Sequence, residues 1–178
     1  MTKTHENQSV SASVRKELLV EAGKAKAFHV FTTEFGRWWP LATHHIGTKS
    51  AETATIEPFV NGRWYERAMD GTECEWGRVL VWDPPNQIVL SWNISSSWRF
   101  DTSLLTEVDV RFEMVTSERT RVVLEHRHLD RYGSDAEKMR TIFDDEGGWT
   151  GILRHYQAHA VGGPVASVGC PSKSDQSA

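Results

Sequence analysis

Histidines supply the first candidate chemistry in this chain. His126 and His128 are separated by one residue in an alternating run, and side chains two apart on a strand share a face. Two imidazoles on one face begin a metal site, but no recognised motif ties a third ligand to them. His155 and His159 are spaced i, i+4, without the glutamate of a zinc-protease helix. We therefore expect no metal and no cofactor, and interpret His126 as a polar anchor inside an apolar cavity.

Carboxylates, serines and cysteines give weaker signals. Residues 144–146 (DDE) precede the last predicted helix, where they would complement its positive end. Residues 95–97 (SSS) lack the strand-turn-helix elbow of a nucleophilic serine. Cys74 and Cys170 have no partner at metal-finger spacing, and we expect reduced thiols. An enzymatic role, with His126 as general base, stays open because it requires a geometry that spacing does not supply.

Tryptophan is the unusual residue, with eight in 178 positions. Such large apolar faces must be covered by core or used on a ligand. Trp38 and Trp39 are neighbours on a predicted helical turn, where side chains point about 100° apart, so we expect one in the core and the other at a cavity rim. Trp92 shares a strand face with aliphatic residues, which suits a cavity wall and an ordinary core equally. Trp98, in a serine-rich loop, is a candidate lid.

Composition and charge exclude several classes of protein. The net charge is −4 with signs mixed throughout, which argues against nucleic acid as a partner. No stretch approaches the ~20 apolar residues of a membrane span, and the N-terminus lacks the apolar core of a signal peptide, so we expect a cytoplasmic protein. Residues 1–12 and 161–178 are polar and rich in small residues, which predicts flexible tails around one domain at 13–160.

Hydrophobic periodicity predicts the elements that position these residues. A strand at 14–20 precedes a helix at 24–34 and a short helical turn that stops at Pro40. After a loop the period changes to two, with hairpin signals such as Asp70-Gly71. The predicted strands are 53–58, 63–69, 73–82, 87–94, 105–115 and 121–128, followed by a short helix at 136–143 and a main helix that begins near Trp149.

The order β-α-α-β6-α predicts an α+β helix-grip fold, a curved antiparallel sheet of about seven strands around a long C-terminal helix. One helix cannot fill the concave face of so wide a sheet, so we expect a cavity between the two. Inward strand residues and the apolar stripe of the helix would line it. The predicted ligand-binding residues are Trp38, Trp39, Tyr65, Trp92, His126, Trp149, Leu153 and Tyr156.

Several local strings also match a known family in order and spacing. They are GRWWP at 36–40, GRWYE at 62–66, GRVL at 77–80, DPP at 83–85, IVLSW at 88–92, TRVVLEHR at 120–127 and GGW at 147–149. On these strings, which span about 14–160, the chain resembles the START-like helix-grip (SRPBCC) superfamily. Within it, the chain is most similar to homologues of the activator of the 90-kDa heat-shock protein ATPase.

The resemblance implies the fold and three functions. Relatives bind hydrophobic ligands, cyclise polyketides or contact chaperones. The leading hypothesis is binding of a hydrophobic or aromatic small molecule in the cavity; the alternatives are a cyclase- or hydrolase-like enzyme on the same cavity and a chaperone-interaction module. The eukaryotic activators carry a further N-terminal domain, whereas residues 1–13 alone precede the first predicted strand here. The family resemblance therefore does not by itself imply chaperone activation.

Overall fold

A computed structural model of the protein describes residues 12–161. The predicted tails, 1–12 and 161–178, lie outside the described residues except for Ala12 and Val161. The elements are β1 (Val14–Val20), α1 (Lys24–Thr32), α2 (Phe35–Trp38), β2 (Ala51–Ile56), β3 (Arg63–Ala68), β4 (Glu73–Asp83), β5 (Gln87–Trp92), β6 (Thr106–Thr116), β7 (Arg119–Arg127), the 3-10 helix η1 (Leu129–Asp135), α3 (Ala136–Asp144) and α4 (Trp149–Val161).

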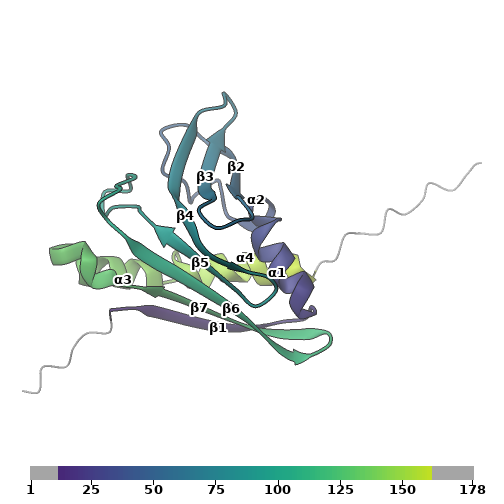
Figure 1. Cartoon of the computed structure of the whole chain (residues 1–178). Helices are drawn as coiled ribbons and strands as arrows, with labels where there is room; N and C mark the ends of the chain where they lie inside the picture. The colour runs from purple at the N-terminus through teal and green to yellow at the C-terminus, as the bar shows by residue number, and fades with distance from the viewer. Residues whose placement is uncertain (1–11, 162–178) are drawn as a thin grey trace, which may run out of the picture.

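The strands form one curved antiparallel sheet in the order β1-β7-β6-β5-β4-β3-β2 (Figure 1). From β2 to β7 each strand pairs with the next in sequence, which is the meander that the turn residues predict. The first strand closes the order by pairing with the last, from Val14 opposite His126 to Val20 opposite Thr120. The predicted α+β helix-grip fold is confirmed.

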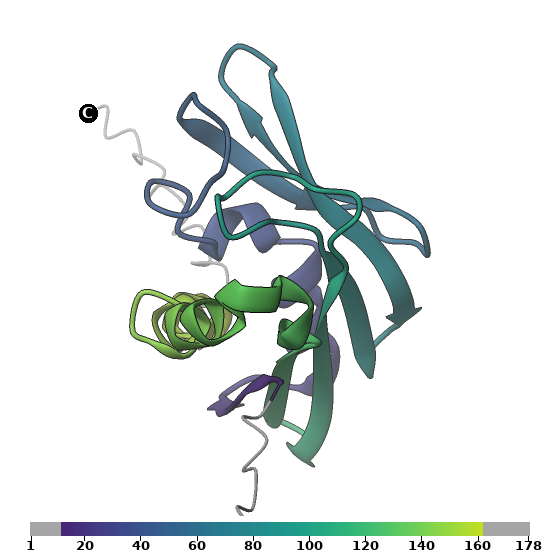
Figure 2. The same ribbon diagram turned by 90° about the vertical axis from the view of Figure 1, so that its left-hand side faces the viewer.

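The helices lie on one side of the sheet, the side toward which it curves (Figure 2). Tyr156 on α4 donates a hydrogen bond of 2.8 Å to the carbonyl of Ala27 on α1. Gln157 donates one of 2.7 Å to the carbonyl of Leu19 on β1. These bonds fix α4 against both neighbours, so the helix lies along the concave face. No helix within residues 12–161 is long and apolar enough to cross a membrane.

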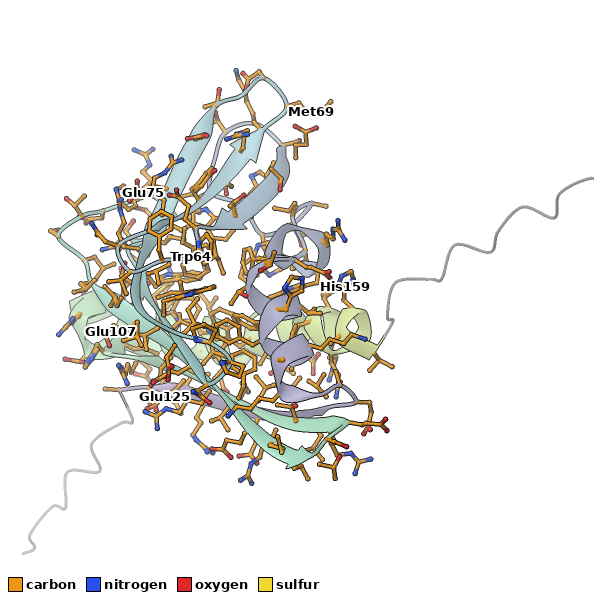
Figure 3. The ribbon with its side chains drawn as sticks, turned by 45° about the vertical axis from the view of Figure 1, so that its right-hand side comes forward. Trp64, Met69, Glu75, Glu107, Glu125 and His159 are labelled. Carbon is orange, nitrogen blue, oxygen red and sulfur yellow. The ribbon has the colours of Figure 1, made fainter. Side chains whose placement is uncertain are left out.

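Alternation along the strands separates a buried inner face from a charged outer face. Val122, Leu124 and His126 on β7 have no exposed surface. Glu75, Glu107 and Glu125 project from the outer side of the sheet in Figure 3, whereas Trp64 lies on the inner side. This is the pattern expected when one face of an antiparallel sheet packs on helices and the other meets water.

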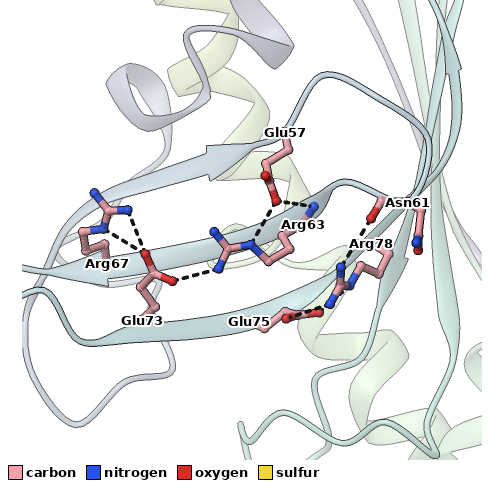
Figure 4. Close-up of polar contacts among 7 residues, drawn as sticks. All are labelled: Glu57, Asn61, Arg63, Arg67, Glu73, Glu75 and Arg78. Carbon is pink, nitrogen blue, oxygen red and sulfur yellow. Dashed lines mark hydrogen bonds and ion pairs between the residues drawn. The ribbon is translucent and has the colours of Figure 1, made fainter.

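Tyr65 belongs to the outer face. The guanidinium carbon of Arg63 lies 4.1 Å from the centre of its ring. Arg63 also pairs with Glu57 at 3.0 Å and with Glu73 at 2.8 Å, and Arg67 pairs with Glu73 at 2.7 Å (Figure 4). These pairs are partly exposed and therefore screened by solvent. Tyr65 is 7% exposed, so it is buried under these arginines on the outer face of the sheet and is not an inward-facing residue.

The predicted shared face of His126 and His128 is wrong. β7 ends at Arg127, and His128 has a φ of +65°, a left-handed conformation that turns the chain into η1. The His128 side chain is 41% exposed, and its Nε2 atom lies 3.6 Å from a carboxylate oxygen of Glu107. Alternation holds only while the strand continues, and this strand stops one residue before the second histidine.

Candidate functional site

A cavity of about 390 Å³ lies between the sheet, the start of α4 and the loop that joins α2 to β2. This volume falls within the ~300–1,000 Å³ of small-molecule sites. Its wall comes from the α2–β2 loop, β4, the end of β5 with its loop, α3, α4 and the turn that joins these two helices. The lining residues are Trp39, Thr43, His44, His45, Ile46, Trp76, Trp92, Ile94, Trp98, Ile142, Phe143, Gly147, Gly148, Trp149 and Ile152.

Four indoles form one connected wall of this cavity. The ring of Trp39 lies 5.4 Å from that of Trp76 and 6.0 Å from that of Trp149, between ring centres. Trp92 lies 5.8 Å from Trp149 and 5.5 Å from Phe143. The last three pairs are edge-to-face, an arrangement that aromatic rings favour, whereas Trp39 and Trp76 are tilted by 48°. The indoles therefore form one continuous aromatic surface.

Three of these indoles are oriented by hydrogen bonds from their N–H groups. Trp39 donates to the carbonyl of His44 at 2.9 Å. Trp76 donates to the carboxylate of Glu66 at 2.9 Å, and Trp149 to Nδ1 of His126 at 3.2 Å. Because the polar atom of each ring is already engaged, the surface that the ring offers to the cavity is apolar.

His126 forms part of a closed hydrogen-bond chain outside the lining set. Its Nδ1 accepts from Trp149, so the proton is on Nε2, which donates to the hydroxyl of Thr106 at 2.9 Å. That hydroxyl donates to the Trp92 carbonyl at 3.0 Å. Complete burial lowers the pKa of His126 to about 3. The ring is therefore neutral with both nitrogens engaged, which leaves it no atom to act as the predicted cavity anchor or as the general base of the alternative enzyme hypothesis.

The eight predicted site residues are divided between the cavity, the core and the outer face of the sheet. Trp39, Trp92 and Trp149 line the cavity. Trp38, Leu153 and Tyr156 are buried core residues outside it. Trp38 donates to the Val30 carbonyl at 3.0 Å, and Tyr156 packs on Phe31 with ring centres 5.1 Å apart. His126 lies in its own hydrogen-bond chain and Tyr65 on the outer face, for the reasons given above.

Trp76 is a wall residue that the sequence does not reveal. In the pairing of β3 with β4, Trp64 faces Gly77 and Tyr65 faces Glu75, so Trp76 is the extra residue of a β-bulge. A bulge redirects a side chain and breaks the simple alternation from which inward residues are predicted. The neighbouring glycine allows close strand packing, since a Cβ on Gly77 would lie 1.9 Å from the Ser91 carbonyl oxygen.

Glu66 fixes the α2–β2 loop against the aromatic wall. Its carboxylate is buried, with 2% of the residue exposed. It accepts hydrogen bonds from the backbone N–H of Ile46 at 2.9 Å, from that of Gly47 at 2.5 Å and from the Trp76 indole. A buried carboxylate is tolerated when it is satisfied in this way. One side chain of β3 thereby sets the positions of both the loop and an indole.

The adjacent histidines of this loop differ in whether a ring nitrogen remains without a hydrogen-bond partner. His44 Nε2 donates to the Gly147 carbonyl at 2.7 Å, and its Nδ1 lies 2.7 Å from the Thr43 hydroxyl. Both of its nitrogens are engaged, and it joins the loop to the start of α4. His45 Nδ1 lies 3.1 Å from the Gly47 carbonyl, which can only accept, so this nitrogen carries the proton. Within residues 12–161, no group of three or more His, Cys, Asp or Glu side chains is placed to hold a metal ion.

Comparison with known proteins agrees with this architecture. The family model described as "Activator of Hsp90 ATPase homolog 1-like protein" matches residues 21–159. The anthrahydroquino-γ-pyrone synthase Txn09, solved as a complex, is 36% identical over 84% of this chain and 96% of its own, with a TM-score of 0.59. No curated protein matches the chain significantly.

Two further structures extend the comparison. The self-sacrificing resistance protein CalC from Micromonospora echinospora is 30% identical over 84% of this chain and 94% of its own, with a TM-score of 0.64. The Aha1 dimer from Colwellia psychrerythraea shares the fold at 16% identity, over 85% and 98% of the two chains, with a TM-score of 0.55. The chain belongs to the family of Activator of Hsp90 ATPase homolog 1-like proteins, as the resemblance of its local strings implies.

Proposed function

We propose that this protein binds a flat aromatic small molecule in the cavity between sheet and α4. The observation that carries the proposal is the wall itself: four indoles and Phe143 surround a space of about 390 Å³ at the start of α4. Burial of an apolar ligand there is favourable at about 25 cal/mol per Å², and aromatic contacts add to it. We expect micromolar affinity or better for a two- or three-ring probe, about −8 kcal/mol.

Two relatives support an aromatic ligand class. Txn09 is named as the synthase of an anthrahydroquino-γ-pyrone, a fused aromatic system, and it is 36% identical to this chain. CalC, at 30% identity, is named as a resistance protein. A shared fold hosts many functions, so these names support the ligand class only in combination with the aromatic wall.

An enzyme on the same cavity is the second candidate, and the synthase at 36% identity favours it. His126 is poorly suited to act as the general base of such an enzyme. Burial lowers the pKa of His126 to about 3 and both its nitrogens are engaged, so it takes no proton from a substrate near neutral pH. His45 is the remaining imidazole that lines the cavity with a nitrogen not bonded to the described residues. A turnover assay would have to test His45.

The test fills the cavity and leaves the fold intact. Ile152 lines the cavity from α4, and Ile152→Trp would place an indole in the space that a ligand needs. Tryptophan fluorescence during titration with anthraquinone should report binding to the wild type and at least tenfold weaker binding to Ile152→Trp. The matched control is Val60→Trp, which adds the same ring at a site that is 61% exposed, and it should bind as the wild type does.

Three outcomes would redirect the proposal. Equal anthraquinone affinity in the wild type and Ile152→Trp, with both folded, would place binding elsewhere. Native mass spectrometry of protein from its own host that shows conversion of a bound molecule would favour the enzyme. Retention of the 90-kDa chaperone, together with no probe binding, would favour the partner hypothesis implied by the family name.

A further inference from the structure

His45 lines the cavity and has a ring nitrogen without a hydrogen-bond partner; the buried N–H of Trp92, another lining residue, also lacks a partner within residues 12–161. With the His45 Nδ1 proton committed to the Gly47 carbonyl, the neutral ring has its lone pair on Nε2. That nitrogen has no partner among residues 12–161. His44 is engaged at both nitrogens, and the Thr43 hydroxyl is engaged with His44. His45 is therefore the histidine of the lining set that retains a free acceptor.

The loop holds His45 in a fixed place. Glu66 binds the two following backbone N–H groups, of Ile46 and Gly47, and Gly47 accepts from the His45 ring. The loop is packed closely at this point, because a Cβ on Gly47 would lie 2.7 Å from a Glu66 carboxylate oxygen and 3.3 Å from the Cys74 sulfur. Imidazole, glycine and carboxylate thus form one unit that orients the free nitrogen.

The rest of the lining set restricts the ligand's charge. None of the lining residues is Asp, Glu, Lys or Arg. A charged ligand would lose hydration without gaining an ion pair, which is costly in an apolar site. An uncharged ligand with one hydroxyl would lose little hydration free energy, because the His45 imidazole can accept a hydrogen bond from that hydroxyl.

We propose that His45 is a specificity-determining residue, whose Nε2 accepts a hydrogen bond from a hydroxyl on the bound aromatic. The ligand class is then uncharged, flat, hydroxylated aromatics such as phenols and hydroxyquinones. This proposal rests on the proposed function, because it needs an aromatic ligand in the cavity. Glu66 and Gly47 are positioning residues, since they act only through the loop.

The test compares two probes of nearly the same shape, 2-naphthol and naphthalene, on the folded full chain. The wild type should prefer 2-naphthol by about threefold to tenfold, the range of one net hydrogen bond. His45→Phe keeps a ring and removes the acceptor, so the preference should fall to about one while naphthalene affinity holds. His155→Phe, at an exposed position on α4 outside the cavity, is the matched control and should keep the preference.

Two further variants separate positioning from contact. His45→Gln retains an acceptor oxygen and should recover part of the preference. Gly47→Ala displaces the loop from Glu66 and should lower the preference without weakening naphthalene binding. Fluorescence emission of bound 2-naphthol adds a spectroscopic readout. On excitation, 2-naphthol transfers its proton to a nearby basic nitrogen, so the wild type should show naphtholate emission. His45→Phe should not show it.

The outcomes distinguish this inference from the function on which it rests. If neither probe binds the wild type, the proposed function fails and the inference with it. If naphthalene binds but the preference is the same in the wild type and folded His45→Phe, the inference is overturned and the proposed function stands. If His45→Phe does not fold, the other two variants decide. The inference is overturned if Gly47→Ala and His45→Gln both keep the full preference for 2-naphthol and the naphtholate emission of the wild type.

Discussion

The space between the sheet and α4 is filled at one end and open at the other. At the filled end α1 inserts Phe28 and Phe31 against Phe112 of β6 and Tyr156 of α4, with ring centres 5.1–5.8 Å apart. At the open end, the end of α3 and the start of α4 meet β5 at Trp92, through Phe143 at 5.5 Å and Trp149 at 5.8 Å between ring centres. The α2–β2 loop and the loop with Trp98 complete the wall there, and about 390 Å³ remains between the rings.

The difference shows what kind of element leaves a cavity. A helix satisfies its own backbone and can present apolar side chains to a sheet on every turn. A loop must find partners for its backbone groups, and here Glu66 and His44 supply them. Trp38 and Trp39 illustrate the consequence: adjacent residues of the same type, one in the filled core and one on the cavity wall.

The largest expected effect on stability comes from removing one aromatic side chain at each end of this space. Phe31→Ala and Trp149→Ala should each reduce the free energy of unfolding by about 3–5 kcal/mol, the usual cost of removing a large buried aromatic. Only Trp149→Ala should also weaken binding of an aromatic probe, because Trp149 lines the cavity and Phe31 does not. Denaturant unfolding and probe titration on both variants measure this. Equal loss of binding in the two would mean that the ends are not functionally distinct.

An intermediate effect is expected at His126, which borders the open end without lining it. His126→Phe leaves the Trp149 N–H without its acceptor, and we expect a loss of about 1–3 kcal/mol in unfolding free energy near pH 7.5. Probe selectivity should not change, since the imidazole offers no free atom to a ligand. A shift toward wholly apolar probes would show that His126 contacts the ligand after all.

The pH dependence at His126 has a defined sign. Burial lowers its folded pKa from 6.5 to about 3, so the unfolded chain binds the extra proton over this range. Stability from the neutral ring is present above pH 6.5 and is lost as the pH falls toward 3, by about 1.4 kcal/mol per unit well inside the window. The stability gap between the wild type and His126→Phe should therefore narrow below pH 6.5. A constant gap would show that burial does not lower the pKa of His126 in the fold.

Strands and helices were more predictable than side-chain placement, for local reasons. Alternation and the turn at Asp70-Gly71 predict a strand over 63–69, and β3 spans Arg63–Ala68. The same strand has Trp64 and Tyr65 side by side, and period two allows only one of them inside. The sequence does not decide which, and the structure places Tyr65 on the outer face.

Two parts of the site depend on contacts that no local pattern encodes. Trp76 faces the cavity because of a bulge in the pairing of β3 with β4. The place of His45 depends on hydrogen bonds from its loop to Glu66, on a strand about 20 residues further along the chain. The His44-His45 pair is visible in the sequence, but its loop has no periodicity from which an orientation could be predicted.

The smallest expected effect on stability concerns Trp98, at the edge of the open end. It lines the cavity with 42% of its surface exposed, and its ring centre lies 6.4 Å from that of Phe143. Its φ of +58° is a left-handed conformation that costs a bulky residue free energy and suits glycine. Trp98→Gly should therefore be more stable than Trp98→Ala by about 1 kcal/mol, measured by denaturant unfolding.

Both variants should release an aromatic probe faster than the wild type, by roughly twofold to fivefold in stopped-flow dissociation, because most affinity changes within one site fall on the dissociation rate. Phe59→Ala is the matched control, since it removes an aromatic ring that is 52% exposed and lies outside the cavity. If instead both Trp98 variants abolish binding, the loop with Trp98 forms part of the binding surface and is not only a lid over the cavity. The open end would then be enclosed by loops on two sides, and its contrast with the helix-filled end would be sharper than the static volume indicates.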